Sequence, residues 1–196
     1  KVVLGSKWPT FFVYYEKGLS GVFGSEINYD YIHTEVSQNF KLGTMGSSVY
    51  KFVYGKYLNA AKMFYTDYEI YPRGDQWFFA SLMESMQIQD TTLTVTDQHF
   101  RIHYAHHFNG AIINFIPLVK KLRIHAVAGA SALWIKESKY LYKEVFFGAE
   151  RTFKMQRSRF RIGVYFVAAE SSYSNITPRI KFAINRYSIR DQSWGY

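Results

Sequence analysis

Four histidines stand close together near the middle of the chain, at His99, His103, His106 and His107. Imidazole is the commonest metal ligand in proteins, so these residues are the first candidates for chemistry. The stretch HFRIHYAHHF, however, alternates between apolar and polar side chains, which is the period-two pattern of a β-strand. On a strand, His103 and His107 share a face but lie about 13–14 Å apart. That separation is too long for two ligands of one ion, and we expect neither a metal nor another cofactor.

Two carboxylates, Glu144 and Glu150, are the second candidates, because paired carboxylates can act as acid and base. They share the polar face of the segment Tyr142–Phe153, and the next segment carries Arg159 and Arg161 on its own polar face. Ion pairing between neighbouring strands accounts for these residues without catalysis. The chain also has no Gly-x-Ser-x-Gly motif around a serine nucleophile. We therefore expect that the protein is not an enzyme.

The composition favours a membrane β-protein. Phe, Tyr and Trp make up 19% of the 196 residues, which suits strands and the aromatic girdles at membrane interfaces. No stretch reaches the roughly 18 consecutive apolar residues of a membrane helix, so a helical membrane protein is excluded. The chain has no cysteine, which rules out disulfides and thiolate metal sites. The net charge of +9 is scattered in alternation with apolar residues, and this distribution argues against a nucleic-acid partner.

Eight segments show the alternation of strands, and one long segment between the third and the fourth lacks it. The eight lie near residues 8–17, 27–40, 49–58, 99–108, 123–134, 142–153, 159–169 and 179–189. The long segment, Asn59–Asp97, contains Arg73-Gly74-Asp75, which we interpret as a turn rather than an adhesion motif. Outer-membrane barrels have long external loops, so we expect an external loop here. The sequence thus predicts an all-β fold, an antiparallel transmembrane β-barrel in a single region, residues 1–196.

The two faces of each predicted strand indicate what each side contacts. On the fourth segment, Phe100, Ile102, Tyr104 and Phe108 would face lipid. His106 falls on the same face, where it would meet lipid, the membrane interface or a protein contact. The opposite faces carry the charges and would line a lumen, because a slip of one residue would place the basic set in hydrocarbon. The predicted lumen-facing residues are Arg101, His103, His107, Glu144, Glu150, Arg159, Arg161, Arg179 and Lys181.

Several stretches carry a resemblance to a known family. They are HHFNGAIINFIPLVKKL at His106–Leu122, VAGASALW, EVFFGAERTFK, KGLSGVFGSEINYD at Lys17–Asp30 and FKLGTMGSS at Phe40–Ser48. These resemble the C-terminal barrel of a Bacteroidota outer-membrane family of unknown function, whose members usually carry an N-terminal carboxypeptidase-regulatory-like domain. That family is in turn distantly similar to the BamA/TamA-type assembly barrels. The resemblance implies a location in the bacterial outer membrane, with the lipid bilayer as a partner.

The assembly barrels also suggest how this chain is organised. They have about sixteen strands, an even number as is the rule for such barrels, and their long sixth external loop enters the lumen and is followed by five strands. The long loop here is also followed by five predicted strands, so the chain resembles the C-terminal half of a sixteen-stranded barrel. The lumen loop of the assembly barrels carries Val-Arg-Gly-Tyr/Phe, whereas the nearest match here is Pro72-Arg73-Gly74-Asp75. Arg73, Gly74 and Asp75 are therefore the candidate lumen-loop residues.

The half-barrel interpretation has a consequence for the first strand. An eight-stranded barrel is only wide enough for its own side chains, so it has no room for a 39-residue loop. We expect an open half whose first strand pairs with the N-terminal half of the same barrel. The chain starts at Lys1 without an initiator Met, and we interpret it as a piece of a longer protein.

The C-terminus offers a candidate export signal. With the long loop outside, the last five strands bring the C-terminus to the periplasmic side. Trp194 and Tyr196 then form either the aromatic signal that the assembly machinery reads or an anchor at the membrane–water interface. Asp191, Gln192 and Ser193 interrupt the alternation before them, so both interpretations stay open.

The leading functional prediction is a structural or assembly role in envelope biogenesis, or a place in an outer-membrane complex with other outer-membrane proteins. A porin-like transport barrel with an open lumen is the first alternative. A soluble β-sandwich that binds a ligand such as a glycan is the second.

Overall fold

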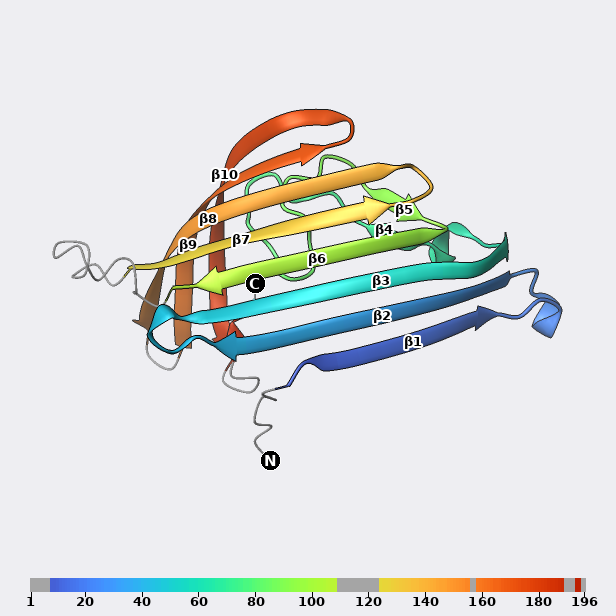
Figure 1. Ribbon diagram of the computed structural model, residues 1–196, viewed down its shortest axis with the longest axis horizontal. Coiled ribbons are helices and arrows are strands. Elements are labelled where there is room, and N and C mark those ends of the chain that lie inside the picture. The colour runs from blue at the N-terminus through green and yellow to red at the C-terminus, as the bar shows by residue number, and fades with distance from the viewer. Residues whose placement is uncertain (1–7, 109–123, 156–157, 189–192, 195–196) are drawn as a thin grey trace.

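The computed structural model describes residues 8–108, 124–155, 158–188 and 193–194, and these residues form an all-β fold. One antiparallel sheet has the strand order β1-β2-β3-β6-β7-β8-β9-β10-β11 (Figure 1). Its strands are β1 (Thr10–Gly18), β2 (Asn28–Lys41), β3 (Ser47–Lys62), β6 (Gln98–His107), β7 (Ile124–Ile135), β8 (Tyr140–Met155), β9 (Ser158–Ser171), β10 (Ser174–Ser188) and β11 (Ser193–Trp194). A separate two-stranded ladder joins β4 (Glu69–Tyr71) to β5 (Leu93–Val95). The described ranges contain short 3-10 turns and no α-helix, and hence no helix that is long and apolar enough to cross a membrane.

Each of the eight predicted segments overlaps one long strand of the sheet. The largest difference in bounds is at β10, which begins at Ser174 although the alternation predicted a start near Arg179. Pro178 lies inside this strand. A proline is tolerated there because β10 pairs with β9 on one side only at that level, so the missing N–H falls on the free side of the strand.

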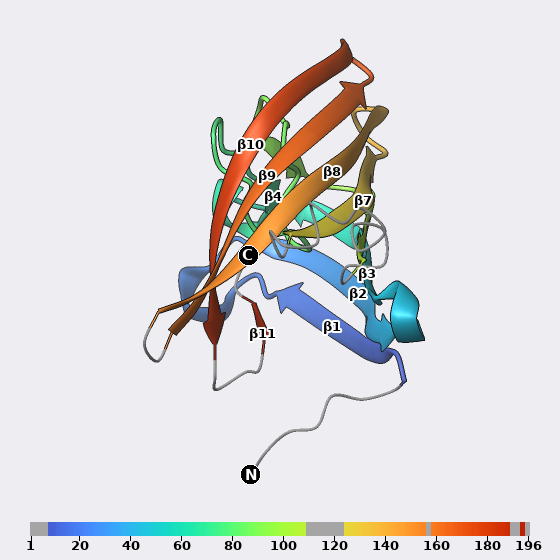
Figure 2. The ribbon, with the colours of Figure 1, turned by 90° about the vertical axis from the view of Figure 1, so that its left-hand side faces the viewer.

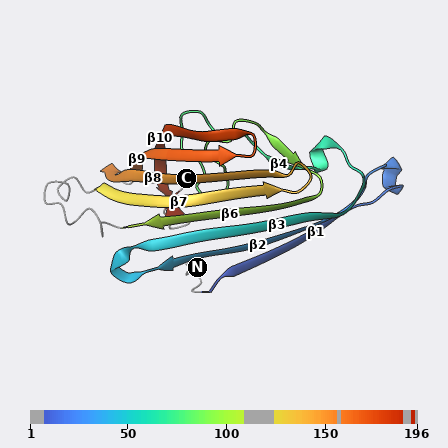
Figure 3. The same cartoon turned by 45° about the horizontal axis from the view of Figure 1, so that its top comes forward.

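The sheet is strongly curved and does not close on itself. Figure 2 shows the strands turning from β1 at the bottom through β7 to β10 at the top. Figure 3 shows the same order across the sheet, with β1 and β10 on opposite sides. No pairing joins β1 to β10 in the described residues, so these residues form an open sheet rather than a closed barrel. The remainder of the predicted sixteen-stranded barrel stays a prediction.

The strands bury polar side chains on the concave face of this sheet and expose apolar ones on the convex face. In β8 every second residue from Tyr140 to Glu150 is buried, including both glutamates. The alternate residues are exposed, and Val145 and Phe147 keep 58% and 54% of their surface. In β10, Lys181 is fully buried although its neighbours Ile180 and Phe182 are exposed. Lys and Glu side chains are rarely fully buried in water-soluble proteins unless they are paired.

The predicted loop Asn59–Asp97 is only partly irregular. β3 continues through Asn59 to Lys62, and the β4–β5 ladder lies further along. Figure 2 shows that the chain between β3 and β6 lies on the concave side of the sheet instead of extending away from it. The prediction of an irregular loop over the whole segment is therefore wrong at its two ends, where the backbone finds strand partners.

His106 lies on the convex side but is buried. Its Nδ1 is 2.7 Å from the Ser48 hydroxyl oxygen, and its Nε2 is 3.0 Å from the carbonyl oxygen of Met45. Gly46 lies in the turn between β2 and β3 and allows this turn to approach β6. A Cβ at position 46 would lie 1.9 Å from the carbonyl oxygen of His107, and the φ of Gly46 is +118°. Of the three alternatives for His106, the structure supports the protein contact.

After β10 the chain reverses direction. Trp194 pairs with Tyr187, and Ser193 pairs with Ser188, in the short antiparallel contact of β11 with β10. Trp194 therefore lies beside β10 and does not continue that strand, and both interpretations of Trp194 stay predictions. Tyr196 lies outside the described residues, as do residues 109–123 and 156–157.

Candidate functional site

Residues 63–97, named the inserted segment here, cover the concave face of the sheet. The base of the segment is fixed to β3 by the hydroxyl of Tyr57, which donates to the carbonyl of Asp67 at 2.8 Å and accepts from the N–H of Glu69 at 3.0 Å. Further along, apolar side chains of the segment share a core with the sheet. They are Tyr71, Phe79, Leu82, Met86, Ile88 and Val95, packed with residues that include Val127, Leu133, Phe146 and Tyr165.

The turn Arg73-Gly74-Asp75 shapes the first part of the inserted segment. The N–H of Gly74 donates to the carbonyl of Gln89 at 2.8 Å, and a Cβ on Gly74 would lie 2.3 Å from the carbonyl oxygen of Gln87. Only glycine fits that space. The carboxylate of Asp75 accepts the backbone N–H groups of Phe78 at 2.6 Å and Trp77 at 2.7 Å. These two bonds lower the pKa of Asp75, because they favour its ionised form.

Lys181 of β10 holds this turn from the concave face. Its ammonium group donates to the backbone carbonyls of Asp75 and Gln87, and at 3.4 Å to that of Phe78. Burial of a charged amine is costly unless its donors find acceptors, and here each of the three N–H bonds has one. Lys181 thus ties two separate parts of the inserted segment to the same strand.

The outer edge of β10 is also bound by the inserted segment. The N–H of Phe79 donates to the carbonyl of Phe182 at 2.8 Å, and the N–H of Phe182 donates to the carbonyl of Trp77 at 3.0 Å. Phe78 forms a parallel bridge with Phe182. Three residues of the segment therefore extend the sheet beyond β10.

Phe79 makes the main aromatic contact between the segment and the sheet. Its ring stacks on that of Tyr165, with centroids 3.9 Å apart and planes 10° apart, and meets Phe146 edge-on at 5.0 Å. Offset stacks and edge-to-face pairs are the favoured arrangements of aromatic rings. Tyr165 and Phe146 therefore form an aromatic packing site for Phe79 on the concave face, next to the buried Lys181.

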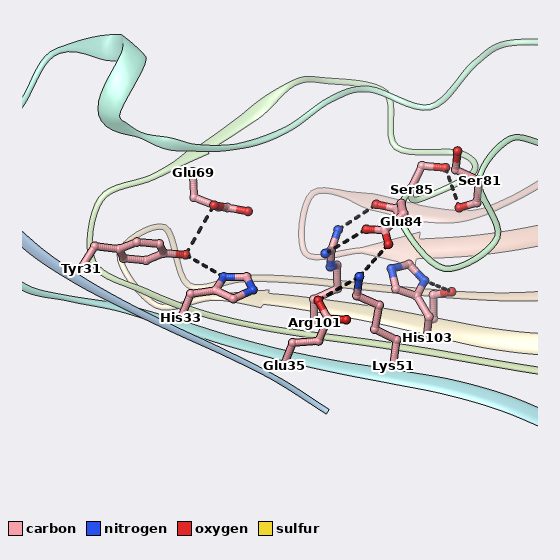
Figure 4. A network of polar contacts seen from close by, with 11 residues as sticks. Tyr31, His33, Glu35, Lys51, Glu69, Ser81, Glu84, Ser85, Arg101 and His103 are labelled. Carbon is pink, nitrogen blue, oxygen red and sulfur yellow. Dashed lines mark hydrogen bonds and ion pairs between the residues drawn. The ribbon is translucent and has the colours of Figure 1, made fainter. Parts of the chain in front are cut away.

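The tip of the inserted segment, Ser81–Ser85, lies on a second set of charges (Figure 4). The Glu84 carboxylate is 2.6 Å from the ammonium of Lys51, which is also 3.0 Å from Glu35. The guanidinium of Arg101 donates to the backbone carbonyl of Glu84 at 2.7 Å and lies 3.7 Å from its carboxylate. Ser81 has a φ of +37°, a strained value for a residue other than glycine.

Two further polar contacts join the sheet to the segment beyond the tip. Glu144 accepts the N–H of Gln87 at 2.8 Å, and the hydroxyl of Tyr142 accepts the N–H of Ile88 at 3.1 Å. Nearer the end of the segment, Arg179 is 3.0 Å from Asp90. Glu144 was predicted to pair with Arg159 and Arg161, and this prediction is wrong because its carboxylate instead accepts the N–H of Gln87 in the inserted segment and, at 2.8 Å, the hydroxyl of Tyr142 on its own strand.

Glu150 does make the predicted pairing with the next strand. Its carboxylate is 3.1 Å from the guanidinium of Arg161, 3.6 Å from His107, and accepts the hydroxyl of Tyr165 at 2.5 Å. The four residues form a polar cluster on the concave face, away from the tip of the segment. Arg159 lies on the same face, opposite Lys154 in the register of β8 and β9.

The histidines do not form a metal centre. His99 and His103 are both fully buried on the concave face, and Nδ1 of His103 is 2.9 Å from the Ser131 hydroxyl oxygen. Among the residues that the structure describes, no group of three or more His, Cys, Asp or Glu side chains is placed to hold a metal ion.

A family model matches residues 1–149, and its description is the C-terminal domain of a family of unknown function, DUF5686. The chain belongs to this family. No curated protein and no solved structure matches it in the corresponding searches. The DUF5686 match covers β1 to β7, most of β8 and the whole inserted segment, so it includes Lys51, Arg101 and Glu144. Lys181, which holds the segment from the other side, lies beyond it.

The nine charged and histidine residues predicted to share one face do share the concave face of this DUF5686 domain, as the strand registers place them. Other residues of the site were missed, namely Glu35, Lys51, Glu84, Gln87 and Tyr142. Lys51 had a usable signal, because it alternates with Tyr50 and Phe52 in the same way as Arg101 does with its neighbours. Gln87 had none, because its backbone makes the contact with Glu144.

Proposed function

We propose that this DUF5686 domain is half of a β-barrel in a bacterial outer membrane and that the inserted segment fills the barrel interior. The observation that carries the proposal is the inversion of the two faces. Lys181 is fully buried, while Ile180 and Phe182 beside it keep 61% and 48% of their surface. A convex apolar face and a polar interior are what a lipid environment requires of a membrane barrel.

The size of the apolar band on the convex face supports this location. On three strands, polar residues that point to the convex side are eight positions apart and have apolar or aromatic residues between them. The pairs are Ser48 and Lys56 in β3, Gln98 and His106 in β6, and Lys143 and Arg151 in β8. Eight residues of strand span about 27 Å along the strand, which is about 19–22 Å along the membrane normal at the usual tilt of about 35–45°. This height is close to, and slightly below, the apolar band of outer-membrane barrels, which is about 25 Å tall.

The open edge at β1 supports a partner from the same barrel. Phe11 and Val13 on its convex side and Phe12 on its concave side are all more than half exposed. In the described residues β2 is its strand partner on one side only. A strand from the N-terminal half would cover this edge and continue the sheet.

The filled interior favours a structural or assembly role over an open pore. The inserted segment occupies the concave face along several strands, with contacts to β3, β6, β8, β9 and β10. We therefore favour a function in envelope biogenesis or in a complex with other outer-membrane proteins, and we expect low conductance in liposomes. A soluble sandwich would need a second sheet over the apolar convex face, and the described residues form no such layer.

Single cysteines test the membrane location, and the chain has no native cysteine to interfere. Phe147→Cys places a thiol on the convex face, and Tyr173→Cys places one in the exposed turn between β9 and β10. In outer-membrane vesicles, we expect a water-soluble maleimide to label Tyr173→Cys and to leave Phe147→Cys unlabelled until detergent and urea are added. Equal labelling of both variants in vesicles would place the convex face in water and overturn the proposal.

A charge on the convex face offers a second measurement. Ile102→Arg should destabilise the membrane-inserted protein by about 2–4 kcal/mol if residue 102 lies near the middle of the bilayer. Lys56→Arg, at the polar boundary of the same face, is the matched control and should change stability little.

A further inference from the structure

The concave face binds the inserted segment mainly through its main chain. Lys181 donates hydrogen bonds to three backbone carbonyls, and Arg101 donates to the carbonyl of Glu84. Glu144 and the Tyr142 hydroxyl each accept a backbone N–H. The edge of β10 adds main-chain pairing with the segment at Phe182. Main-chain groups are common to all polypeptides, so these contacts recognise a polypeptide main chain rather than one particular sequence.

Charge adds selectivity to this recognition. Residues 63–97 contain six acidic residues and one basic residue, whereas the other 161 residues contain nine acidic and 23 basic ones. Two of the acidic side chains meet cations of the concave face, Glu84 at Lys51 and Asp90 at Arg179. The face therefore matches an acidic polypeptide better than a neutral or basic one.

The ion pairs that hold the acidic side chains are at the rim. Glu84 and Asp90 each keep 59% of their side-chain surface, and pairs this exposed add little stability. At the tip, the buried Nε of Arg101 also lacks a partner. The strained Ser81 lies in the same tip. The polar contacts of the tip are thus more exposed than those of the turn at Lys181, although Leu82 of the tip is buried in the shared core.

We propose that the concave face is a polypeptide-binding surface and that an acidic segment of a partner protein takes the place of the tip of the inserted segment. The partner would bring a carboxylate to Lys51 and Arg101 and a backbone carbonyl to Arg101, while the turn of the inserted segment stays bound to Lys181. The inserted segment then acts as a built-in competitor. This inference goes beyond the proposed function, because the binding is measured in detergent and does not depend on the membrane location.

A peptide with the sequence of residues 73–90 serves as the probe, labelled with a fluorophore and followed by anisotropy. The full chain is compared with the variant Glu84→Gln/Asp90→Asn. This variant removes both rim ion pairs of the inserted segment and leaves Lys51 and Arg179 available to the peptide. Exposed ion pairs contribute about 0.2–1 kcal/mol each, so loss of both corresponds to a gain in affinity for the peptide of about twofold to thirtyfold. Glu170→Gln, an exposed substitution on the convex face, is the control and should bind like the unchanged chain.

Three results would overturn the proposal. The first is that the Glu84→Gln/Asp90→Asn variant binds the peptide no better than the unchanged chain. The second is that a peptide with Asn, Gln and Asn at positions 75, 84 and 90 binds as well as the acidic one. The third is that inorganic polyphosphate displaces the peptide and binds as tightly, which would show recognition of charge without a polypeptide. In the Glu84→Gln/Asp90→Asn background, where the competitor no longer brings a carboxylate to these cations, Lys51→Gln/Arg101→Gln should lower peptide binding while the far-ultraviolet circular dichroism of the sheet is unchanged.

Discussion

The two edges of the sheet are built in opposite ways. β1 exposes aromatic side chains on both of its faces, with Phe11 71% and Phe12 54% exposed, and β2 is its strand partner on one side only in the described residues. β10 has its concave side chain Lys181 fully buried and its outer edge bound by Trp77 and Phe79. An uncovered strand edge is a site for pairing with another chain. The comparison shows that one edge is uncovered among the described residues and that the protein covers the other edge with its own chain.

The difference also predicts where the protein is stable. Apart from the strand ladder, β1 is joined to β2 by polar contacts at the surface, such as Lys17 with Asp30 at 3.0 Å, and exposed pairs of this kind contribute little. β10 is joined to the inserted segment by buried contacts. We therefore expect local opening to begin at β1 and the region around Lys181 to open only with the whole sheet.

Matched aromatic truncations should give the largest contrast between the edges. Phe79→Ala removes a ring that is 2% exposed and stacked on Tyr165, and large-to-small changes of this kind cost about 3–5 kcal/mol. Phe12→Ala, on β1, removes a ring that is more than half exposed and should cost far less. Urea unfolding in detergent measures both. Equal losses for the two variants would contradict the proposed difference between the edges.

Neutralising Lys181 should have the next largest effect. Lys181→Gln keeps a donor but cannot satisfy three backbone carbonyls, and unsatisfied buried acceptors cost about 1–3 kcal/mol. Hydrogen exchange should increase around Asp75–Phe79 and remain unchanged in β1. Lys143→Gln, on the exposed face of β8, is the control. A uniform increase in exchange over the whole sheet would show that Lys181 stabilises the fold in general and does not act as an anchor for the segment.

A methyl group at position 74 should have a smaller effect. The added Cβ in Gly74→Ala meets the carbonyl oxygen of Gln87 at 2.3 Å, and overpacking of this kind costs about 1–3 kcal/mol. Proteolysis of the inserted segment should become faster, while the thermal transition of the sheet changes little. Gln76→Ala, an exposed substitution two residues away, should leave the cleavage rate unchanged. If both variants are cleaved at the rate of the unchanged chain, the turn is not a tight anchor.

The comparison also explains which parts of the structure were accessible from the sequence. The side of each strand that carries charge was predicted because a strand has a period of two, and one slip would exchange every side chain. The contacts of Lys181 were not predictable, because its acceptors are backbone carbonyls of residues about 100 positions earlier. The same holds for Glu144, whose donor is the backbone of Gln87. A period-two pattern in the sequence predicts which side chains share a strand face. It does not predict hydrogen bonds to backbone groups, because every residue type carries the same backbone groups.

The smallest predicted effect is a dependence of the turn on pH. The N–H groups of Phe78 and Trp77 hold the pKa of Asp75 below the ordinary value of 3.8 in the folded protein. For a carboxyl with a lowered folded pKa, the stabilisation is present above the unfolded pKa and is lost as the pH falls through the folded pKa. Pepsin, which is active in acid, should therefore cleave near Trp77–Phe79 more readily as the pH drops from about 5 to below 3.8. Asp75→Asn cannot ionise and corrects for the pH dependence of pepsin itself. The ratio of the unchanged chain's cleavage rate to that of Asp75→Asn should rise as the pH falls, and a constant ratio would show that the ionised Asp75 does not hold the turn.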